Sequence, residues 1–134
     1  MINTSEVFVR LVFSALVGGL IGLEREIVHR PAGVRTHMLV SLGSALFVLV
    51  TLETFPDEGA RIIAGVATGI GFLGAGTIFK SKDGVQGLTT AASVWTVSAI
   101  GLAIGLGHYL MTIIAVLLIL IILQLNKTEF FKRL

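Results

Sequence analysis

The chain of 134 residues contains no cysteine and only two prolines. Without cysteine, neither a disulfide framework nor a thiolate-bound metal site can form, and so little proline argues against long linkers. Charged residues make up 13% of the sequence, compared with about 25% in a typical soluble domain. Hydrophobic residues make up 54%, and the mean hydropathy is +0.96. So short and apolar a chain cannot cover itself with polar surface in water, so the composition predicts a membrane protein.

Five apolar runs, separated by short polar segments, follow one another along the chain. They cover residues 4–23, 36–55, 62–79, 88–106 and 109–125. As helices rising about 1.5 Å per residue, runs of this length cross a hydrocarbon core of about 30 Å. We therefore predict an all-α fold in which residues 1–134 form a single polytopic transmembrane helical bundle of about five spans, with a tight hairpin between the last two.

Lysine and arginine gather on one side of this alternating path. That side carries Arg25, Arg30, Arg35, Lys80, Lys82, Lys127, Lys132 and Arg133. The other side carries Arg61 near three acidic residues. The positive-inside rule makes the basic side cytoplasmic, so we expect the N-terminus outside and the C-terminus in the cytoplasm. Because topology explains the basic pI, we predict no nucleic-acid partner.

The stretch "GIGFLGAG", residues 69–76, contains the G-x-G-x-x-G spacing of a dinucleotide-binding turn. It lies inside an apolar run, and "TTAASVW" stands where that motif needs an acidic residue, so we reject nucleotide binding and predict no cofactor. Small residues in spans instead indicate close helix packing. The predicted packing positions are Gly18, Gly22, Gly65, Gly69, Gly71, Gly74, Gly76, Gly101 and Gly105. We expect runs 4–23, 62–79 and 88–106 to form the tight interior; the alternative is that the glycines break run 62–79 beside a polar cavity.

Polar residues are densest around the turn between the first two runs. The predicted functional cluster comprises Glu24, Arg25, Arg30, Arg35, Thr36 and His37, together with Asp83 from the next loop on that side. Glu24 follows a glycine-lined face, and Arg35 is placed to meet it or to meet Asp83. A buried ion pair that locks the spans together is the favoured interpretation, whereas an unpaired Glu24 could bind a cation or proton.

Hydroxyl side chains recur at helical spacing in run 88–106. Thr89, Ser93 and Thr96 fall on one face, and Thr90 lies beside them. We expect these hydroxyls to bond backbone carbonyls or a neighbouring helix, and the alternative is that they line a polar cavity. Trp95 falls in the middle of the run, which predicts a core position.

The opposite side of the membrane carries little chemistry. Arg10 is expected to have a structural role, in which it either extends to the membrane surface or pairs with Glu6, one helical turn earlier. The carboxylates of Glu53, Asp57 and Glu58 are hard ligands of the kind that Mg²⁺ or Ca²⁺ prefers, although three carboxylates in a loop are more often simply solvated. No serine, histidine and acid arrangement suggests hydrolysis, so we predict that the protein is not an enzyme.

Three motifs in order, "GLIGLEREIVHRPAGVRTH", "GIGFLGAGTIFK" and "GLTTAASVWTVSAIGLAIG", resemble the transmembrane domain of the MgtC/SapB family of bacterial membrane proteins. The resemblance covers about residues 12–107. It implies a polytopic helical domain in the bacterial inner membrane. Members are associated with growth under magnesium limitation and, in some pathogens, with survival inside host cells. Virulence members are thought to modulate the F-type ATP synthase.

The resemblance also assigns signature positions. The charged signature falls on Glu24, Arg25, Arg30, Gly33, Arg35 and Thr36. The glycine signature falls on Gly69, Gly71, Gly74 and Gly76, and that of the fourth span on Gly87, Leu88, Thr90, Ala91, Ala92 and Trp95. The sequence departs from the pattern at Gln86, where many members have Arg, and at Thr89, where some have Asn. Many members continue into a soluble domain that has no counterpart before Leu134, so its regulatory role is not carried over.

Two functions follow as hypotheses. The first is a non-enzymatic regulatory membrane protein linked to magnesium stress, which acts by contacting another membrane protein; the resemblance implies the ATP synthase. The alternative is a small cation or proton transporter that uses Glu24, Arg35 and the hydroxyl face of run 88–106. A homodimer is also expected, because leftover glycine faces need a partner. Charges facing a hydrated cavity would favour transport, and charges held in ion pairs would favour the regulator.

Overall fold

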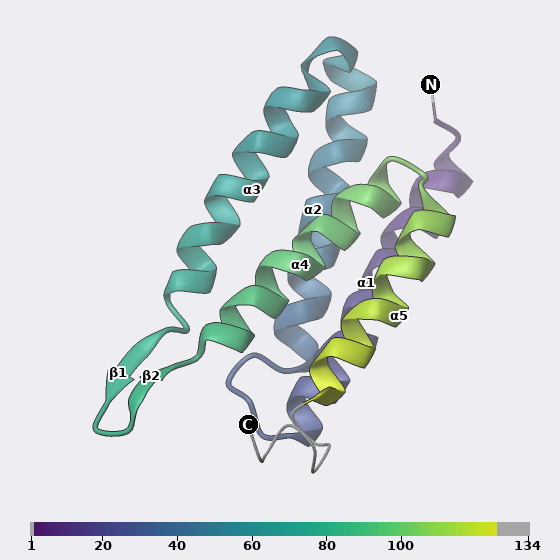
Figure 1. Ribbon diagram of the computed structural model, residues 1–134. Helices are drawn as coiled ribbons and strands as arrows, with labels where there is room; N and C mark the ends of the chain where they lie inside the picture. Colours follow the sequence, from purple (N-terminus) through teal and green to yellow (C-terminus); the bar gives the residue numbers. More distant parts are fainter. Residues whose placement is uncertain (1, 126–134) are drawn as a thin grey trace.

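The computed structural model describes residues 2–125, which form five α-helices and one short hairpin (Figure 1). In chain order the elements are α1 (Thr4–Ile27), α2 (Val34–Thr54), the 3₁₀-helix η1 (Pro56–Glu58), α3 (Gly59–Ala75), β1 (Phe79–Ser81), β2 (Gly84–Gln86), α4 (Leu88–Gly105) and α5 (Tyr109–Gln124). By length and composition, α1, α2 and α4 can each cross a membrane, and α5 is a shorter apolar helix. The predicted all-α membrane bundle is confirmed. Its orientation remains a prediction, and Lys127, Lys132 and Arg133 lie outside the described residues.

Helix α2 lies at the centre of the bundle. Small residues of α1 let the backbones of α1 and α2 approach each other closely. A methyl group at Gly18 would lie 2.5 Å from the carbonyl oxygen of His37, and one at Gly22 would lie 2.7 Å from that of Gly33. Carbon atoms do not approach carbonyl oxygens so closely, so both positions admit only glycine at this helix separation. This is the small-residue packing that brings helices together in a lipid environment.

Close contacts at glycine also join α4 to the opposite side of α2. A methyl group at Gly101 would overlap the carbonyl oxygen of Ser41, and one at Gly105 would lie 2.9 Å from that of Ala45. The apolar core continues from this contact through buried residues of α1, α2, α4 and α5: Ile21, Val40, Val94, Val97, Ile100, Ile104 and Val116. Three helices, α1, α2 and α4, therefore make up the tight interior.

Helix α3 lies at the edge of this interior, which corrects one prediction. Gly65, Gly69 and Gly71 are exposed, and a methyl group added at any of them would have no other atom within 4 Å; Gly74 is the one described α3 residue that is buried. The place expected for run 62–79 is taken by α2, which contributes Ser41, Ser44 and Ala45 to the close contacts. Helix α3 is nevertheless an unbroken α-helix that ends at Ala75, with the exposed Gly76 as its C-cap.

The outer surface of the bundle is strongly apolar. Helix α5 buries Thr112 and Val116, and an edge-on contact between Phe13 and Tyr109, with ring centroids 5.8 Å apart, joins it to α1. Trp95 is 50% exposed on α4, so its predicted core position is wrong. The side chains of Val94 and Val97, on either side of it in the sequence, are buried inside the bundle instead. In a membrane the exposed apolar side chains would face lipid.

A β-hairpin occupies the connection between α3 and α4, where the sequence predicted a longer span and a simple turn. Strands β1 and β2 are antiparallel, with Phe79 opposite Gln86, Lys80 opposite Val85 and Ser81 opposite Gly84. Gly84 has a φ of 111°, a left-handed conformation suited to glycine at this tight turn. The hairpin lies at the same end of the bundle as the α1–α2 connection (Figure 1), and we call this end, which carries Arg25, Arg30, Arg35, Lys80 and Lys82, the basic end.

The glycine contacts predict opposite effects for two alanine substitutions. Gly101→Ala should lower the free energy of unfolding by about 1–3 kcal/mol, because the new methyl group forces α4 away from α2. Gly65→Ala should leave it unchanged or raise it by up to about 1 kcal/mol, because the site is open and alanine favours the helix. Unfolding of the two variants in mixed detergent micelles, followed by helical circular dichroism, measures both; equal losses would contradict the central role of the α2–α4 contact.

Candidate functional site

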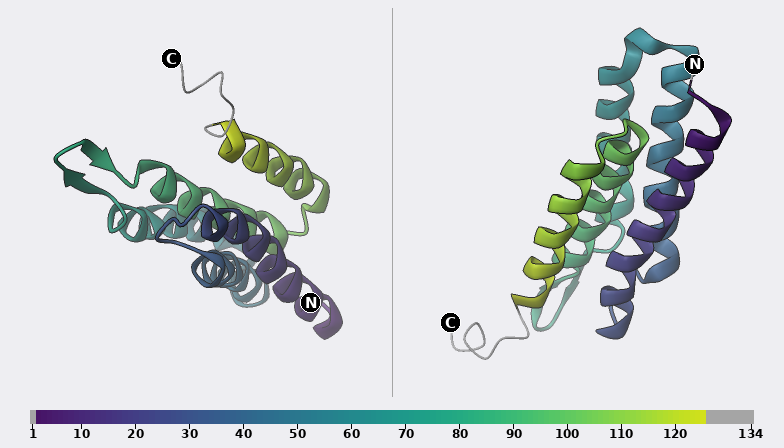
Figure 2. Two further views of the ribbon diagram at one scale, coloured as in Figure 1. Left: turned by 90° about the horizontal axis from the view of Figure 1, so that it is seen from below. Right: turned by 90° about the vertical axis from the view of Figure 1, so that its right-hand side faces the viewer.

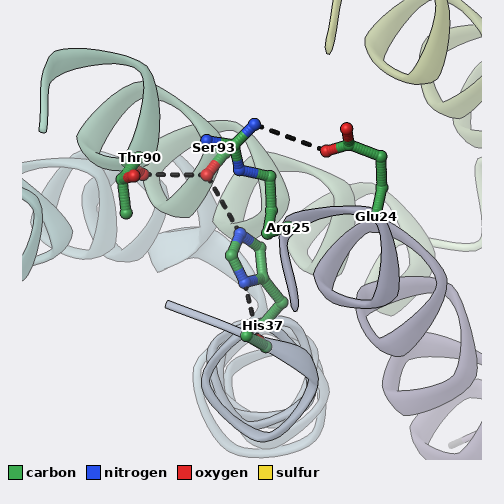
Figure 3. Close-up of polar contacts among 6 residues, drawn as sticks. Glu24, Arg25, His37, Thr90 and Ser93 are labelled. Atoms are coloured by element: carbon green, nitrogen blue, oxygen red, sulfur yellow. Dashed lines mark hydrogen bonds and ion pairs between the residues drawn. The ribbon is translucent and has the colours of Figure 1, made fainter. Parts of the chain in front are cut away.

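Five polar side chains from three helices meet inside the basic end of the bundle (Figure 3). Glu24 and Arg25 come from α1, His37 from α2, and Thr90 and Ser93 from α4. All are buried: the exposed fraction is 7% for Glu24, 4% for Arg25 and zero for His37. We call these residues the buried polar cluster. Buried polar groups are costly unless they bond to one another, so such a cluster specifies how its helices are arranged.

His37 bridges α2 and α4. Its Nδ1 lies 2.9 Å from the carbonyl oxygen of Gly33, and its Nε2 lies 3.0 Å from the hydroxyl oxygen of Ser93. Because a carbonyl can only accept, Nδ1 carries the hydrogen, and in the neutral ring Nε2 is then an acceptor. The Ser93 hydroxyl thus has two acceptors within reach, His37 Nε2 and the carbonyl oxygen of Thr90 at 2.8 Å.

Arg25 and Glu24 form an ion pair at the end of α1. Arg25 Nη1 lies 3.4 Å from Glu24 Oε2. The arginine side chain extends from α1 toward α4 (Figure 3), and its charge acts on the ring of His37. A cation in the last turn of a helix is also favoured by the helix dipole. The ion pair on α1 therefore lies beside the residues that join α2 to α4, so all three central helices contribute to the cluster.

The structure places the other predicted cluster residues apart from this site. Arg35 is exposed and forms no ion pair with any residue between 2 and 125, so the expected pairing of Arg35 with Glu24 or Asp83 is wrong. Helix α2 begins at Val34, and Arg35 lies two positions before the inward-facing His37, a turn of about 200° around the helix. Arg30 is exposed and Thr36 is half-buried. Asp83 is exposed at the tip of the hairpin, where its backbone N–H donates to the Ser81 hydroxyl at 3.3 Å.

Glu26 has a role that was not predicted from the sequence. Its Oε2 accepts a hydrogen bond of 2.8 Å from the backbone N–H of Val34, the first residue of α2. Gly33, which precedes α2, has no side chain to cap the helix, so a carboxylate from α1 satisfies one of the free N–H groups at the helix start. The sequence signal that could have revealed this role is Gly33 before α2, which leaves the helix with no capping side chain of its own.

The hydroxyl face predicted for run 88–106 is rotated in the structure. Thr90 and Ser93 are buried, whereas Thr89 is exposed and Thr96 donates to the carbonyl of Ala92 in its own helix at 2.6 Å. A further polar contact between α2 and α4 was not predicted: the hydroxyls of Ser44 and Ser98 form a hydrogen bond of 2.8 Å. The hydroxyls thus bond to carbonyls and to the neighbouring helix.

At the opposite end of the bundle, the side chain of Arg10 is partly buried, with 11% of its surface exposed. Arg10 pairs with Glu6 as expected, and its Nη1 also donates to the carbonyl oxygen of Gly105 at 2.6 Å, which ties α1 to the end of α4. The acidic residues Glu53, Asp57 and Glu58 are exposed, and over residues 2–125 no three acidic, histidine or cysteine side chains are grouped to hold a metal ion. The metal hypothesis therefore gains no support from these carboxylates.

An apolar groove of about 660 Å³ lies between α2 and α3. It is lined by Leu39, Val40, Gly43, Ser44, Phe47, Arg61, Ile62, Gly65, Val66, Gly69 and Ile70. Arg61 is the one charged residue of this lining, and it forms an exposed pair with Glu58 at 3.5 Å. The groove therefore offers little to hold an ion away from bulk water.

Comparison with known proteins identifies the relatives of this bundle. A model of the MgtC family matches residues 11–130. The chain belongs to the MgtC family. It is 41% identical over 130 residues to the protein SrpB of Synechococcus elongatus, a match that covers 86% of this chain and 71% of SrpB.

Two further relatives of this family member are longer than the chain. The "Putative magnesium transporter YhiD" of Escherichia coli K12 is 41% identical over 130 residues, which cover 90% of the chain and 60% of YhiD. Protein MgtC of Salmonella typhimurium LT2 is 44% identical over 110 residues, which cover 82% of the chain and 48% of MgtC. The chain thus spans between about half and three fifths of the length of these two proteins. No solved structure matches significantly.

The ion pair predicts unequal roles for two arginines. Arg25→Met should lower the free energy of unfolding by about 3–5 kcal/mol, because it removes one partner of a buried charge pair. Arg35→Met should change it by no more than about 0.5 kcal/mol, because that side chain is exposed. Titration of the reconstituted variants with a denaturing detergent compares the two; a larger loss from Arg35→Met would restore the pairing that the sequence suggested.

The helix-bridging hydrogen bond predicts a second matched pair. Ser93→Ala should cost about 1–3 kcal/mol of unfolding free energy, because the buried Nε2 of His37 loses its described partner. Thr96→Ala removes a hydroxyl of the same helix that bonds only within α4, so we expect close to no change. Thermal unfolding of both variants in one detergent tests this, and indistinguishable melting curves would mean that the His37–Ser93 contact does not stabilise the bundle.

Proposed function

We propose that this member of the MgtC family is a non-enzymatic protein of the bacterial inner membrane that acts by contacting another membrane protein during magnesium limitation. The alternative, passage of a cation or proton through the bundle, requires polar groups that face a hydrated path. The two functions therefore differ in what the charges inside the bundle are expected to contact.

The observation that carries the proposal is that the charges inside the bundle are held by ion pairs and hydrogen bonds to other protein groups. Arg25 pairs with Glu24 inside the basic end, and Arg10 is held by Glu6 and by the carbonyl oxygen of Gly105 at the opposite end. Between these two ends of the bundle, α2 and α4 pack so closely that Gly101 contacts the backbone of Ser41. Charges held in this way stabilise a fixed bundle and are poorly placed to exchange ions with water.

The edge helix α3 supplies a surface for the contact. Gly65 and Gly69 lie one helical turn apart beside the groove between α2 and α3, and both are exposed with open space around them. Lipid tails are as apolar as leucine, so helices in a membrane associate through close packing at small residues rather than through the hydrophobic effect. A helix of another membrane protein could approach the α3 backbone here, and a second copy of this chain is the other occupant that this surface would accept.

The link to magnesium rests on the relatives. One of them is named as a putative magnesium transporter, and the family resemblance implies an association with growth under magnesium limitation. The resemblance makes the ATP synthase the first partner to examine. Because the chain spans only part of those relatives, the activity of the whole proteins supports the proposal by analogy alone.

The test is crosslinking within the membrane in magnesium-poor medium. A photoreactive amino acid at Leu73, exposed on α3 one helical turn after Gly69, should capture one specific heterologous membrane protein when placed in a tagged chain, while the same group at Leu118, on the exposed side of α5, should not. Gly69→Leu should abolish capture and growth support without loss of protein, because nothing in the described part of the chain packs against this site. Only self-crosslinks, or ion flux by the purified protein in liposomes, would overturn the proposal.

A further inference from the structure

The β1–β2 hairpin leaves the bundle in a fixed direction because its base is locked. The hydroxyl of Thr77 donates to the carbonyl oxygen of Gly74 at 2.8 Å and lies 3.4 Å from that of Gly87. Gly87 has a φ of 90°, and a methyl group there would overlap the carbonyl oxygen of Thr77. The two ends of the hairpin are therefore held together where they join α3 and α4.

The hairpin projects sideways at the basic end. It lies level with the connection between α1 and α2 and extends past the ends of α3 and α4, the two helices that it joins (Figure 1). A view along the bundle shows it reaching outside the outline of the helices (Figure 2). If the helices cross the membrane, a segment at this height and outside the bundle lies where the lipid headgroups meet the acyl chains.

The surface of the hairpin suits that position on both of its faces. Phe79 and Val85 are each 56% exposed. The strand register pairs Phe79 with Gln86 and Val85 with Lys80, so these two apolar side chains fall on opposite faces of the ribbon. A protein that docks on a ribbon covers one face and leaves the other in water, whereas lipid surrounds both. The distribution of apolar side chains therefore favours lipid as the partner.

The charges of this end complement acidic lipids. Lys80 and Lys82 of the hairpin are exposed, as are Arg30 and Arg35 of the neighbouring turn and helix; the exposed acidic residues near them are Glu26 and Asp83. Lysine can lay its apolar stem along the lipid boundary and keep its ammonium group among the phosphates. Clusters of basic residues beside a membrane span attract anionic lipid headgroups.

We propose that the β1–β2 hairpin is a membrane-interface anchor, in which Phe79 and Val85 insert at the boundary of the acyl chains and Lys80 and Lys82 bind the phosphates of anionic lipids. The anchor would fix the basic end of α3, whose one described buried residue is Gly74, relative to the lipid surface. It is independent of the function proposed above, since it requires no partner protein.

The absence of cysteine from the chain makes the test direct. Single variants Phe79→Cys and Val85→Cys carry a spin label, with Leu118→Cys as the lipid-exposed control and Asp57→Cys as the water-exposed control. Each is reconstituted into vesicles of phosphatidylcholine with or without phosphatidylglycerol. Accessibility of the label to oxygen and to a water-soluble nickel chelate reports its depth.

In vesicles that contain phosphatidylglycerol, we expect labels at positions 79 and 85 to lose nickel accessibility and gain oxygen accessibility, to values between those of the two controls. Adding Lys80→Gln and Lys82→Gln should return the label at position 85 toward its value in phosphatidylcholine alone, with unchanged helical circular dichroism. Nickel accessibility equal to that at position 57 in both lipids would overturn the anchor. Protection from both reagents would also overturn it, because protein would then cover the hairpin. A depth that is independent of phosphatidylglycerol and of the two lysines would overturn the headgroup contact.

Discussion

The fold depends on how closely α1 and α4 approach the backbone of α2. In lipid, burying apolar side chains between helices gains little over leaving them in the acyl chains, so close packing has to hold the bundle together. Gly18 and Gly22 on one side of α2, and Gly101 and Gly105 on the other, remove the side chains that would keep the helices apart. The remaining elements are arranged around this three-helix unit.

The buried polar cluster is a consequence of that packing. Helices this close leave polar side chains between them little access to water, so each must bond to protein groups. His37 does so through Gly33 and Ser93, and Ser44 does so through Ser98. The same bonds fix the axial position of α4 against α2, which glycine contacts alone would leave free to slide. Packing and polar bonding thus specify the arrangement jointly.

Hydropathy and spacing predicted the helices well, and the identity of their contacts less well. The apolar runs locate all five helices because each must cross or line an apolar medium. Glycine marks where a close approach is possible, and only the fold decides where it occurs: Gly101 packs on α2, while Gly65 faces open space. The sequence favoured Arg35 as the partner of Glu24, whereas Arg25 has that role in the structure. Helix α2 begins at Val34, and the phase of the helix that results turns Arg35 outward. The hairpin was missed because Ile78 and Phe79 read as the end of an apolar run.

The two parts of the bundle differ in how firmly they are held, and this difference gives α3 its significance. Helices α1, α2 and α4 are joined by glycine contacts and hydrogen bonds, whereas α3 buries Gly74 against α4 and borders the apolar groove with α2. The buried polar cluster contains no residue of α3, so a movement of this helix would leave the cluster in place. A surface that must adapt to another membrane component is best placed outside the tight interior. Helix α3 offers such a surface, with Gly65 and Gly69 open beside the groove and the hairpin at its end.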